Sequence, residues 1–202
     1  SVSVSNRGGT ALSSGVKVKA IDPDRTITET LTVHFKFDEP SGTTAANDGS
    51  DGIDGSVDGT GNWTAGQIGN AFDGDAFSMI LVDEFTPIEE EVTVSLWVSA
   101  EPAIFGETVA FIRNADGALG VAAPLEQFEF GLIPDADDVT GEACNLRVAI
   151  AAGPNTATVV EPAAFPLGTW QQVAFTADGG QIRLYRNGEL VGVSTYLDAI
   201  NQ

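Results

Sequence analysis

The sequence predicts an all-β protein, in which a two-sheet antiparallel β-sandwich follows an N-terminal β arm. Three observations support this prediction. Apolar and polar residues alternate with period two in many short runs, Gly-rich and Pro-rich breaks separate the runs, and no stretch shows a convincing helical period. Strands with one apolar face bury that face by packing two sheets together. A chain of 202 residues is long enough for one such domain and too short for two of ordinary size.

The most clearly patterned stretch is 169–195, which predicts three consecutive antiparallel strands. Val173 and Phe175 alternate with polar or small neighbours, and the two runs that follow alternate in the same way. Asp178-Gly179-Gly180 separates the first two runs, and Asn187-Gly188 separates the last two. Because glycine and asparagine tolerate the positive φ of tight turns, both connections predict hairpins.

Runs of the same kind predict the rest of the sandwich upstream. The loop expected at residues 47–62 is rich in glycine and aspartate, which favour turns over strands. The further strands that the alternation predicts are residues 26–37, 76–82, 91–99, 108–112, 127–133, 145–151 and 157–160.

Residues 1–24 predict a short β arm, because Val2 and Val4 alternate with serine and glycines supply turns. The predicted organisation is therefore an arm at residues 1–25 and a sandwich at residues 26–202. We expect the arm either to lie along its own sandwich or to dock onto the acidic body of a neighbouring copy. It carries four of the nine basic residues, namely Arg7, Lys17, Lys19 and Arg25.

Four stretches in order resemble the laminin-G-like, concanavalin A-like jelly-roll family. They are the Phe-Asp-Glu-x-Ser-Gly segment that begins at Phe37, the Trp-Thr-x-Gly-x-x-Gly-Asn-Ala segment that begins at Trp63, the strand at residues 92–98, and the meander at residues 169–195 with its Tyr-x-Asn-Gly hairpin. The resemblance extends from about residue 30 to residue 195 and implies a two-sheet jelly roll. It implies no particular activity, because one fold carries many functions.

The charge of the chain disfavours two classes of partner. The sequence contains 29 acidic and 9 basic residues, which gives a net charge of −20. Such a surface repels nucleic-acid phosphates and anionic membrane surfaces, so we expect neither as a partner. No apolar run approaches a membrane span, so no membrane insertion is expected. Carboxylates spread along the chain predict a salt-adapted source, where ions screen their mutual repulsion.

The strongest chemical signal is the loop at residues 47–58, where acidic and amide residues are interleaved with glycines. Carboxylate, amide and backbone oxygens on a flexible loop are the ligands that Ca²⁺ prefers. The resemblance also implies a structural calcium ion here, although Asn47 stands where the family prefers aspartate. The alternative is a solvated, turn-rich acidic loop. The predicted calcium ligands are Asn47, Asp48, Asp51 and Asp54.

The sequence predicts no enzyme. Glu89-Glu90-Glu91 is the densest carboxylate run, but adjacent strand residues point to opposite faces and cannot form the acid and nucleophile of a retaining glycosidase. His34 is the only histidine and lies in a predicted strand, which leaves a nucleophilic triad without support. Cys144 is the only cysteine, and its acidic neighbours raise the pKa of a thiol rather than lowering it.

The three tryptophans divide into two groups. Trp63 and Trp170 match positions that pack inside the family's domains, so we expect them to pack. Trp97 alternates with Leu96 and Val98 and therefore faces away from that apolar row. Trp97 is the candidate for stacking on a sugar, and burial beneath a second layer or the arm is the alternative.

Two functions remain open at this point. The first is a non-catalytic structural or adhesive protein of an extracellular assembly, such as a virion surface or an appendage of a salt-adapted system. The chain stops before the last strand that such domains usually have and starts without a leader, so we expect the arm or another subunit to cover the open edge. The second is a glycan-binding, lectin-like module of a secreted or cell-surface protein.

Overall fold

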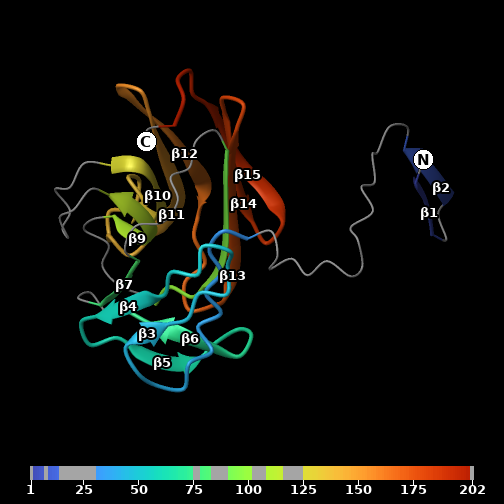
Figure 1. Cartoon of the computed structure of the whole chain (residues 1–202). Coiled ribbons are helices and arrows are strands. Elements are labelled where there is room, and N and C mark those ends of the chain that lie inside the picture. The colour runs from blue at the N-terminus through green and yellow to red at the C-terminus, as the bar shows by residue number, and fades with distance from the viewer. Residues whose placement is uncertain are drawn as a thin grey trace. The chain divides into compact units, whose positions relative to one another are not determined.

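The computed structural model of the chain describes residues 2–6, 9–13, 31–74, 78–82, 91–101, 108–115 and 125–200 (Figure 1). The chain divides into two compact units, residues 1–85 and residues 86–202. No described helix is long and apolar enough to cross a membrane.

Residues 86–202 form two four-stranded antiparallel sheets, which lie in separate layers (Figure 1). The first sheet has the order β15-β14-β13-β8 and consists of β8 (Val92–Val98), β13 (Gln171–Asp178), β14 (Gln181–Arg186) and β15 (Glu189–Thr195). The second has the order β12-β11-β10-β9 and consists of β9 (Val109–Ala115), β10 (Leu125–Pro134), β11 (Cys144–Ala152) and β12 (Asn155–Ala164). The predicted all-β, two-sheet antiparallel sandwich is confirmed.

The core of this unit lies between the two sheets, because the inward positions of their strands are apolar. Val173, Phe175 and Ala177 on β13 are fully buried, while the residues between them are partly exposed. The Phe175 ring contacts the rings of Phe128 and Phe130 from β10, with centroid distances of 5.4 and 5.1 Å. Each buried aromatic side chain of this kind contributes about 1.5–3 kcal/mol. This cluster therefore holds the two layers together.

Both hairpin turns predicted for the C-terminal meander are present. Gly179 and Gly180 have φ angles of 52° and 83°, and Asn187 and Gly188 have φ angles of 51° and 80°. The Asn187 backbone N–H donates to the Gln172 carbonyl at 2.7 Å, and Asn187 Oδ1 accepts from the Gln172 backbone N–H at 3.0 Å. The second turn is thereby fixed to Gln172 on β13.

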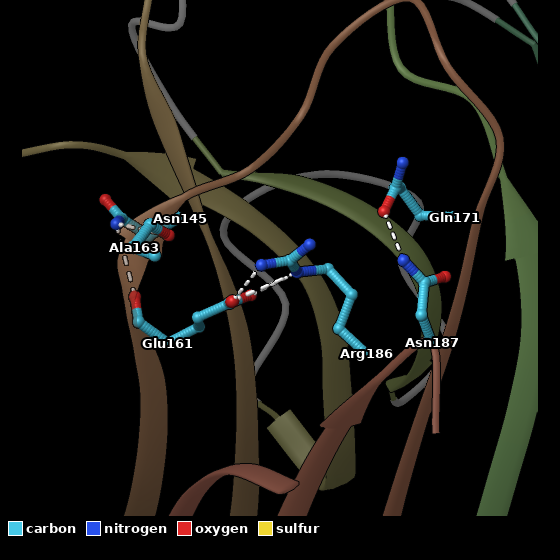
Figure 2. Close-up of polar contacts among 6 residues, drawn as sticks. All are labelled: Asn145, Glu161, Ala163, Gln171, Arg186 and Asn187. Carbon is cyan, nitrogen blue, oxygen red and sulfur yellow. Dashed lines mark hydrogen bonds and ion pairs between the residues drawn. The ribbon is translucent and has the colours of Figure 1, made fainter. Parts of the chain in front are cut away.

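A buried ion pair joins the two sheets (Figure 2). Glu161 of β12 is 2% exposed, and its two carboxylate oxygens each accept from Arg186 Nε at 3.0 Å. Arg186 Nη2 on β14 donates to Glu161 Oε1 at 2.5 Å. Asn145 Nδ2 donates to the carbonyls of Glu161 and Ala163 across a register shift between β11 and β12. The pair fixes the alignment of one layer on the other.

The first unit, residues 1–85, contains three small antiparallel sheets in its described part. Trp63 packs against Phe37 and Phe72, at centroid distances of 6.4 and 5.5 Å, and its Nε1–H donates to the Gly42 carbonyl at 2.9 Å. The expectation that Trp63 packs is thus confirmed. The three sheets are the β1 (Val2–Asn6) and β2 (Gly9–Ser13) hairpin, the β3 (Thr44–Ala45), β4 (Gly55–Asp58) and β7 (Met79–Leu81) sheet, and the β5 (Asn62–Ala65) and β6 (Asn70–Asp73) hairpin.

Two predictions for the first unit were wrong for the residues that the structure describes. The strand expected at residues 26–37 is absent from residues 31–37, where only Phe35 forms a bridge, with Asn47. Phe37 has a φ of 59°, which lies outside the extended region of a strand. The loop expected at residues 47–62 contains β4, which pairs with β3 and β7. The hairpin of β1 and β2 confirms β structure near the N-terminus. The predicted boundary at residues 25 and 26 lies outside the described residues and stays a prediction.

Candidate functional site

The candidate site is the outward face of the first sheet, which we call the Trp97 face. On β8, Val92, Val94, Leu96 and Val98 point inward, so the residues between them point outward. The strand register then brings outward residues of four strands side by side. The Trp97 face consists of Thr93, Ser95, Trp97, Gln172, Ala174, Thr176, Arg183, Tyr185, Leu190 and Val193.

Trp97 is the large aromatic side chain that this face exposes most. It lies on the edge strand β8, and 44% of its surface is exposed. Among the described residues of 86–202 nothing buries Trp97, and burial beneath the arm stays an open alternative. Gln172 on β13 lies directly opposite Trp97, and its Nε2 donates to Ser95 Oγ at 2.7 Å. The indole of Trp97 thus lies beside Gln172 and Ser95, which a hydrogen bond between their side chains holds in place.

The same face ends in a hollow at the turn between β13 and β14. The hollow has a volume of about 490 Å³, and a salt bridge of 2.7 Å between Arg183 Nη1 and Asp178 Oδ1 lies in its lining. Two carboxylates and one guanidinium therefore face the same space, a set that can hydrogen-bond the hydroxyl groups of a ligand. The lining residues are Glu91, Asp178, Gly179, Gly180, Gln181, Arg183 and Thr195.

Tyr196 lies next to this hollow and is 8% exposed. Its backbone N–H donates to the Gly180 carbonyl at 2.9 Å. Burial raises the pKa of the Tyr196 hydroxyl above its ordinary value, and the carboxylates of Asp178 and Glu91 raise it further. The carboxylates that line the hollow therefore disfavour ionisation of the Tyr196 hydroxyl.

The predicted calcium ligands lie in the first unit, where internal contacts occupy most of them. Asn47 Oδ1 accepts from the N–H groups of His34 and Gly49, both at 2.8 Å. The Asn47 N–H donates to Asp54 Oδ1 at 2.9 Å, and Asp48 Oδ2 lies 2.5 Å from Lys36 Nζ. The structure therefore brings Asn47 and Asp54 together and turns Asp48 toward a lysine.

No group of three or more His, Cys, Asp or Glu side chains in the described part of the chain is placed to hold a metal. Asp51 Oδ2 is buried and has no hydrogen-bond partner there, so one oxygen of the set is uncommitted. Calcium binding at this loop stays a prediction.

The other reactive residue types are placed as follows. His34 is partly buried, and its backbone N–H and carbonyl bond to Asn47 and Asp48. Cys144 is fully buried at the start of β11, and burial together with Asp135 raises the pKa of its thiol to about 11. Glu89 and Glu90 lie outside the described residues, whereas Glu91 is exposed at the hollow.

Sequence reasoning found Trp97 but missed its partners on the face. From the sequence, Gln172 could be recognised only as an outward residue of the strand that became β13. Its position opposite Trp97 depends on the register between β8 and β13. These strands are far apart in the sequence, since Ser95 and Gln172 are separated by 77 residues. Asp178 was assigned to a turn, and nothing in the sequence placed Glu91 beside it. The sequence does not show which strands pair or in which register, so it could not bring these residues together.

Comparison with known proteins agrees with this architecture. The family model described as the concanavalin A-like lectin/glucanases superfamily matches residues 72–202. Among solved structures, the chain is similar to domain 4 of AbnA, a GH43 extracellular arabinanase from Geobacillus stearothermophilus, in complex with arabinotriose. The TM-score is 0.61 at 21% identity, over 85% of this chain and 78% of that one. No curated protein matches the sequence. The chain belongs to the concanavalin A-like lectin/glucanase superfamily.

Proposed function

We propose that this chain is a lectin-like module that binds a glycan on the Trp97 face without cleaving it. The observation that carries the proposal is the exposed indole of Trp97, which lies on a sheet face beside the bonded pair of Gln172 and Ser95. Sugars present an apolar face of C–H groups and a rim of hydroxyl groups. Binding sites for such ligands combine aromatic surface with a few fixed polar groups.

The extent of the face suits an oligosaccharide. Asp178 follows Gln172 by six positions on β13, a distance of about 20 Å at about 3.4 Å per residue. Trp97 lies near one end of this stretch, and Arg183 with Asp178 lies at the other. A chain of sugar units laid along the strand would stack on the indole and place hydroxyl groups at the hollow. The similar arabinanase domain was solved with arabinotriose, which supports a glycan as the ligand class.

We propose binding rather than hydrolysis because of the environment of the carboxylates. Glu91 and Asp178 line one hollow, but Asp178 forms a salt bridge with Arg183 and Glu91 is exposed. A glycosidase acid needs a protonated carboxyl at working pH, which burial in an apolar pocket provides. Neither residue has such surroundings here. A module of this kind acts outside the cell, and we propose a secreted or cell-surface location.

Assembly through the N-terminal arm stays a separate prediction. Two-stranded hairpins are marginally stable alone, so the hairpin of β1 and β2 needs a partner surface. The hairpin could dock onto a neighbouring copy in an assembly such as a virion surface or appendage. Alternatively, it could dock onto the body of its own chain. Light scattering on the full chain and on a variant that lacks residues 1–24 tests it, since equal masses would contradict assembly through the arm.

A glycan array tests the proposed function. The full chain should bind a restricted set of oligosaccharides, and Trp97→Ala should lose that binding. Val139→Ala is the matched control, because Val139 is a fully exposed apolar residue in the loop between β10 and β11 of the second sheet, away from the Trp97 face. Chromatography of the best ligand after prolonged incubation should show no shorter products. Absence of any binding would overturn the proposal, and shortened products would overturn its non-catalytic part.

A further inference from the structure

The hairpin of β5 and β6 carries a sequence feature that the Trp97 face does not involve. Asn62-Trp63-Thr64 has the form Asn-x-Thr, in which x is any residue but proline, and this form is the acceptor of N-linked glycans in secreted proteins. The chain has nine asparagines, and Asn62 alone is followed two positions later by serine or threonine. Because a three-residue pattern also arises by chance, the surroundings of Asn62 in the folded chain decide whether it can carry a glycan.

The strand β5 places the three residues on two different faces. Trp63 is partly buried, and the rings of Phe37 and Phe72 pack against its indole. Asn62 and Thr64 are exposed, because neighbouring residues of a strand point to opposite sides. The packing of Trp63 therefore holds the strand in place and leaves the acceptor amide and the hydroxyl on the same outward side.

The side-chain amide of Asn62 is also uncommitted. Between residues 31 and 200, several described asparagines donate a hydrogen bond from the side-chain amide nitrogen, namely Asn47, Asn70, Asn114, Asn145 and Asn187. Asn62 and Asn155 are the described asparagines of that range without such a bond, and both are exposed. A glycan on a bonded asparagine displaces a contact of the folded chain, whereas a glycan on Asn62 displaces none. In this range, Asn62 is the one described asparagine with both a free amide and a threonine two positions later.

The neighbours of Asn62 leave space on the outward side of the hairpin. Asn62 is the Cα partner of Asp73 on β6, and Asp73 is exposed as well. The next outward pair is Thr64 with Ala71, so the side chains around Asn62 are small or polar. Attached sugars are bulky and hydrophilic and therefore belong on such a surface. The first sugar ring would meet polar groups and no large apolar side chain of the hairpin.

We propose that Asn62 is an attachment site for an N-linked glycan. The donor is an oligosaccharide linked through a diphosphate to a membrane lipid, and an oligosaccharide transferase that recognises the Thr64 hydroxyl brings it to the Asn62 amide. Asn62 Nδ2 forms a bond to the anomeric carbon and loses one proton. The bond from that carbon to the diphosphate breaks, and the lipid diphosphate leaves with the electron pair. This inference rests on the secreted or cell-surface location proposed above, but it does not require the Trp97 face to bind a ligand.

Mass spectrometry tests the proposal on the full chain, purified from the cells that produce it. The peptide that contains Asn62 should carry sugar masses on that residue, and the intact chain should exceed its unmodified mass of 21.0 kDa. Asn62→Gln should abolish the addition because it removes the acceptor, and Thr64→Ala should abolish it because it removes the hydroxyl. Thr64→Ser retains a hydroxyl and should keep the addition. Circular dichroism of these variants should match that of the parent chain, so that a lost addition does not reflect misfolding.

Asn155 provides a matched control within the same chain. It is exposed like Asn62, but Ala157 stands two positions after it, where a glycan acceptor needs serine or threonine. Asn155→Gln should therefore leave the mass of the glycan on the chain unchanged. Ala157→Ser supplies the missing hydroxyl with the addition of one oxygen atom, and it should add a second glycan, on Asn155.

Two outcomes would overturn this inference. The first is an unmodified Asn62 in the chain from its producing cells, and a glycan on Asn155 of the Ala157→Ser variant beside a bare Asn62 would trace that failure to the surroundings of Asn62. The second is a set of sugar masses that persists in full in Asn62→Gln, which would assign the modification to other residues.

Glycan-array binding, measured on the same preparations, separates this inference from the proposed function. Asn62→Gln should leave array binding unchanged, and Trp97→Ala should leave the glycan on Asn62 unchanged. An array without binding, next to a modified Asn62, would overturn the proposed function alone.

Discussion

Glu161 and Arg186 form an ion pair in a place that a sandwich usually fills with apolar side chains. The Glu161 side chain is almost inaccessible, and Arg186 surrounds its carboxylate with three hydrogen bonds (Figure 2). The carboxylate raises the pKa of Arg186. Removing one member of such a pair leaves an uncompensated charge, whereas replacing both can be nearly neutral. The change in unfolding free energy therefore depends on whether one member of the pair or both are replaced.

Glu161→Ala should lower the free energy of unfolding by about 3–5 kcal/mol, because Arg186 loses its partner inside the structure. The double variant Glu161→Leu with Arg186→Met should be more stable than either single variant. Urea denaturation followed by circular dichroism measures all of them. If Glu161→Ala costs less than about 1 kcal/mol, the pair does not align the sheets as described.

At the level of elements, Gly192 shows how β15 of the first sheet approaches β12 of the second. A Cβ at Gly192 would lie 2.5 Å from Val159 Cγ1, and Val159 is 4% exposed. No positive φ is involved, so the constraint is the available space. Gly192→Ala should lower the unfolding free energy by about 1–3 kcal/mol, the usual effect of overpacking.

A second substitution distinguishes a clash from a general defect in β15. Val159→Ala removes the atom that the new Cβ would meet, so adding it to Gly192→Ala should recover part of the lost stability. Thermal unfolding of the single and double variants gives the interaction energy. Strict additivity of the two losses would contradict a direct contact between these positions.

The loop between β10 and β11 makes a pH-dependent contribution through Asp138. Its carboxylate accepts from the Ala143 N–H at 2.6 Å and from the Thr140 hydroxyl and N–H, and these bonds lower its pKa to about 2. Because the folded pKa of Asp138 lies below 3.8, the ordinary value for an aspartate, the stabilisation is complete above pH 3.8 and is lost as the pH falls toward 2.

Asp138→Asn should therefore be less stable than the parent chain at pH 7, and the difference should shrink between pH 4 and pH 2. Chemical denaturation across this range measures it. Asp137→Asn is the matched control in the same turn, since the Asp137 side chain contacts no other described residue and only its N–H bonds to Asp135. A constant difference between Asp138→Asn and the parent at all pH values would contradict this account.

Elements that alternate strictly were the ones that could be predicted from the sequence. β8 and β13 have clear inward and outward sides, which gave the sandwich and the outward orientation of Trp97. Residues 31–37 alternate equally well, yet side-chain bonds replace a ladder there, with Asn47 Oδ1 accepting from the His34 N–H. Such bonds compete with strand pairing and leave no trace in the apolar pattern. The hollow also could not be predicted, because it depends on which strands become neighbours.

For the whole molecule, the net negative charge is expected to affect stability. Most of the 29 acidic residues repel one another, since only 9 basic residues are present. Added salt screens this repulsion within a Debye length, which falls from about 30 Å at 0.01 M to about 8 Å at 0.15 M. The melting temperature should therefore rise with NaCl. A melting temperature that is flat from 0.01 to 0.5 M by scanning calorimetry would show that repulsion is unimportant, and it would remove the argument for a salt-adapted source.

Contact between Trp97 and a glycan is tested directly by the indole N–H signals of the ¹⁵N-labelled full chain. The chain has three tryptophans, and Trp97 is the one that the first sheet exposes. The substitution Trp97→Phe assigns its signal. On addition of the oligosaccharide selected by the array, the Trp97 signal should move while those of Trp63 and Trp170 stay in place. A glycan that binds and leaves the Trp97 signal unchanged would contradict the account.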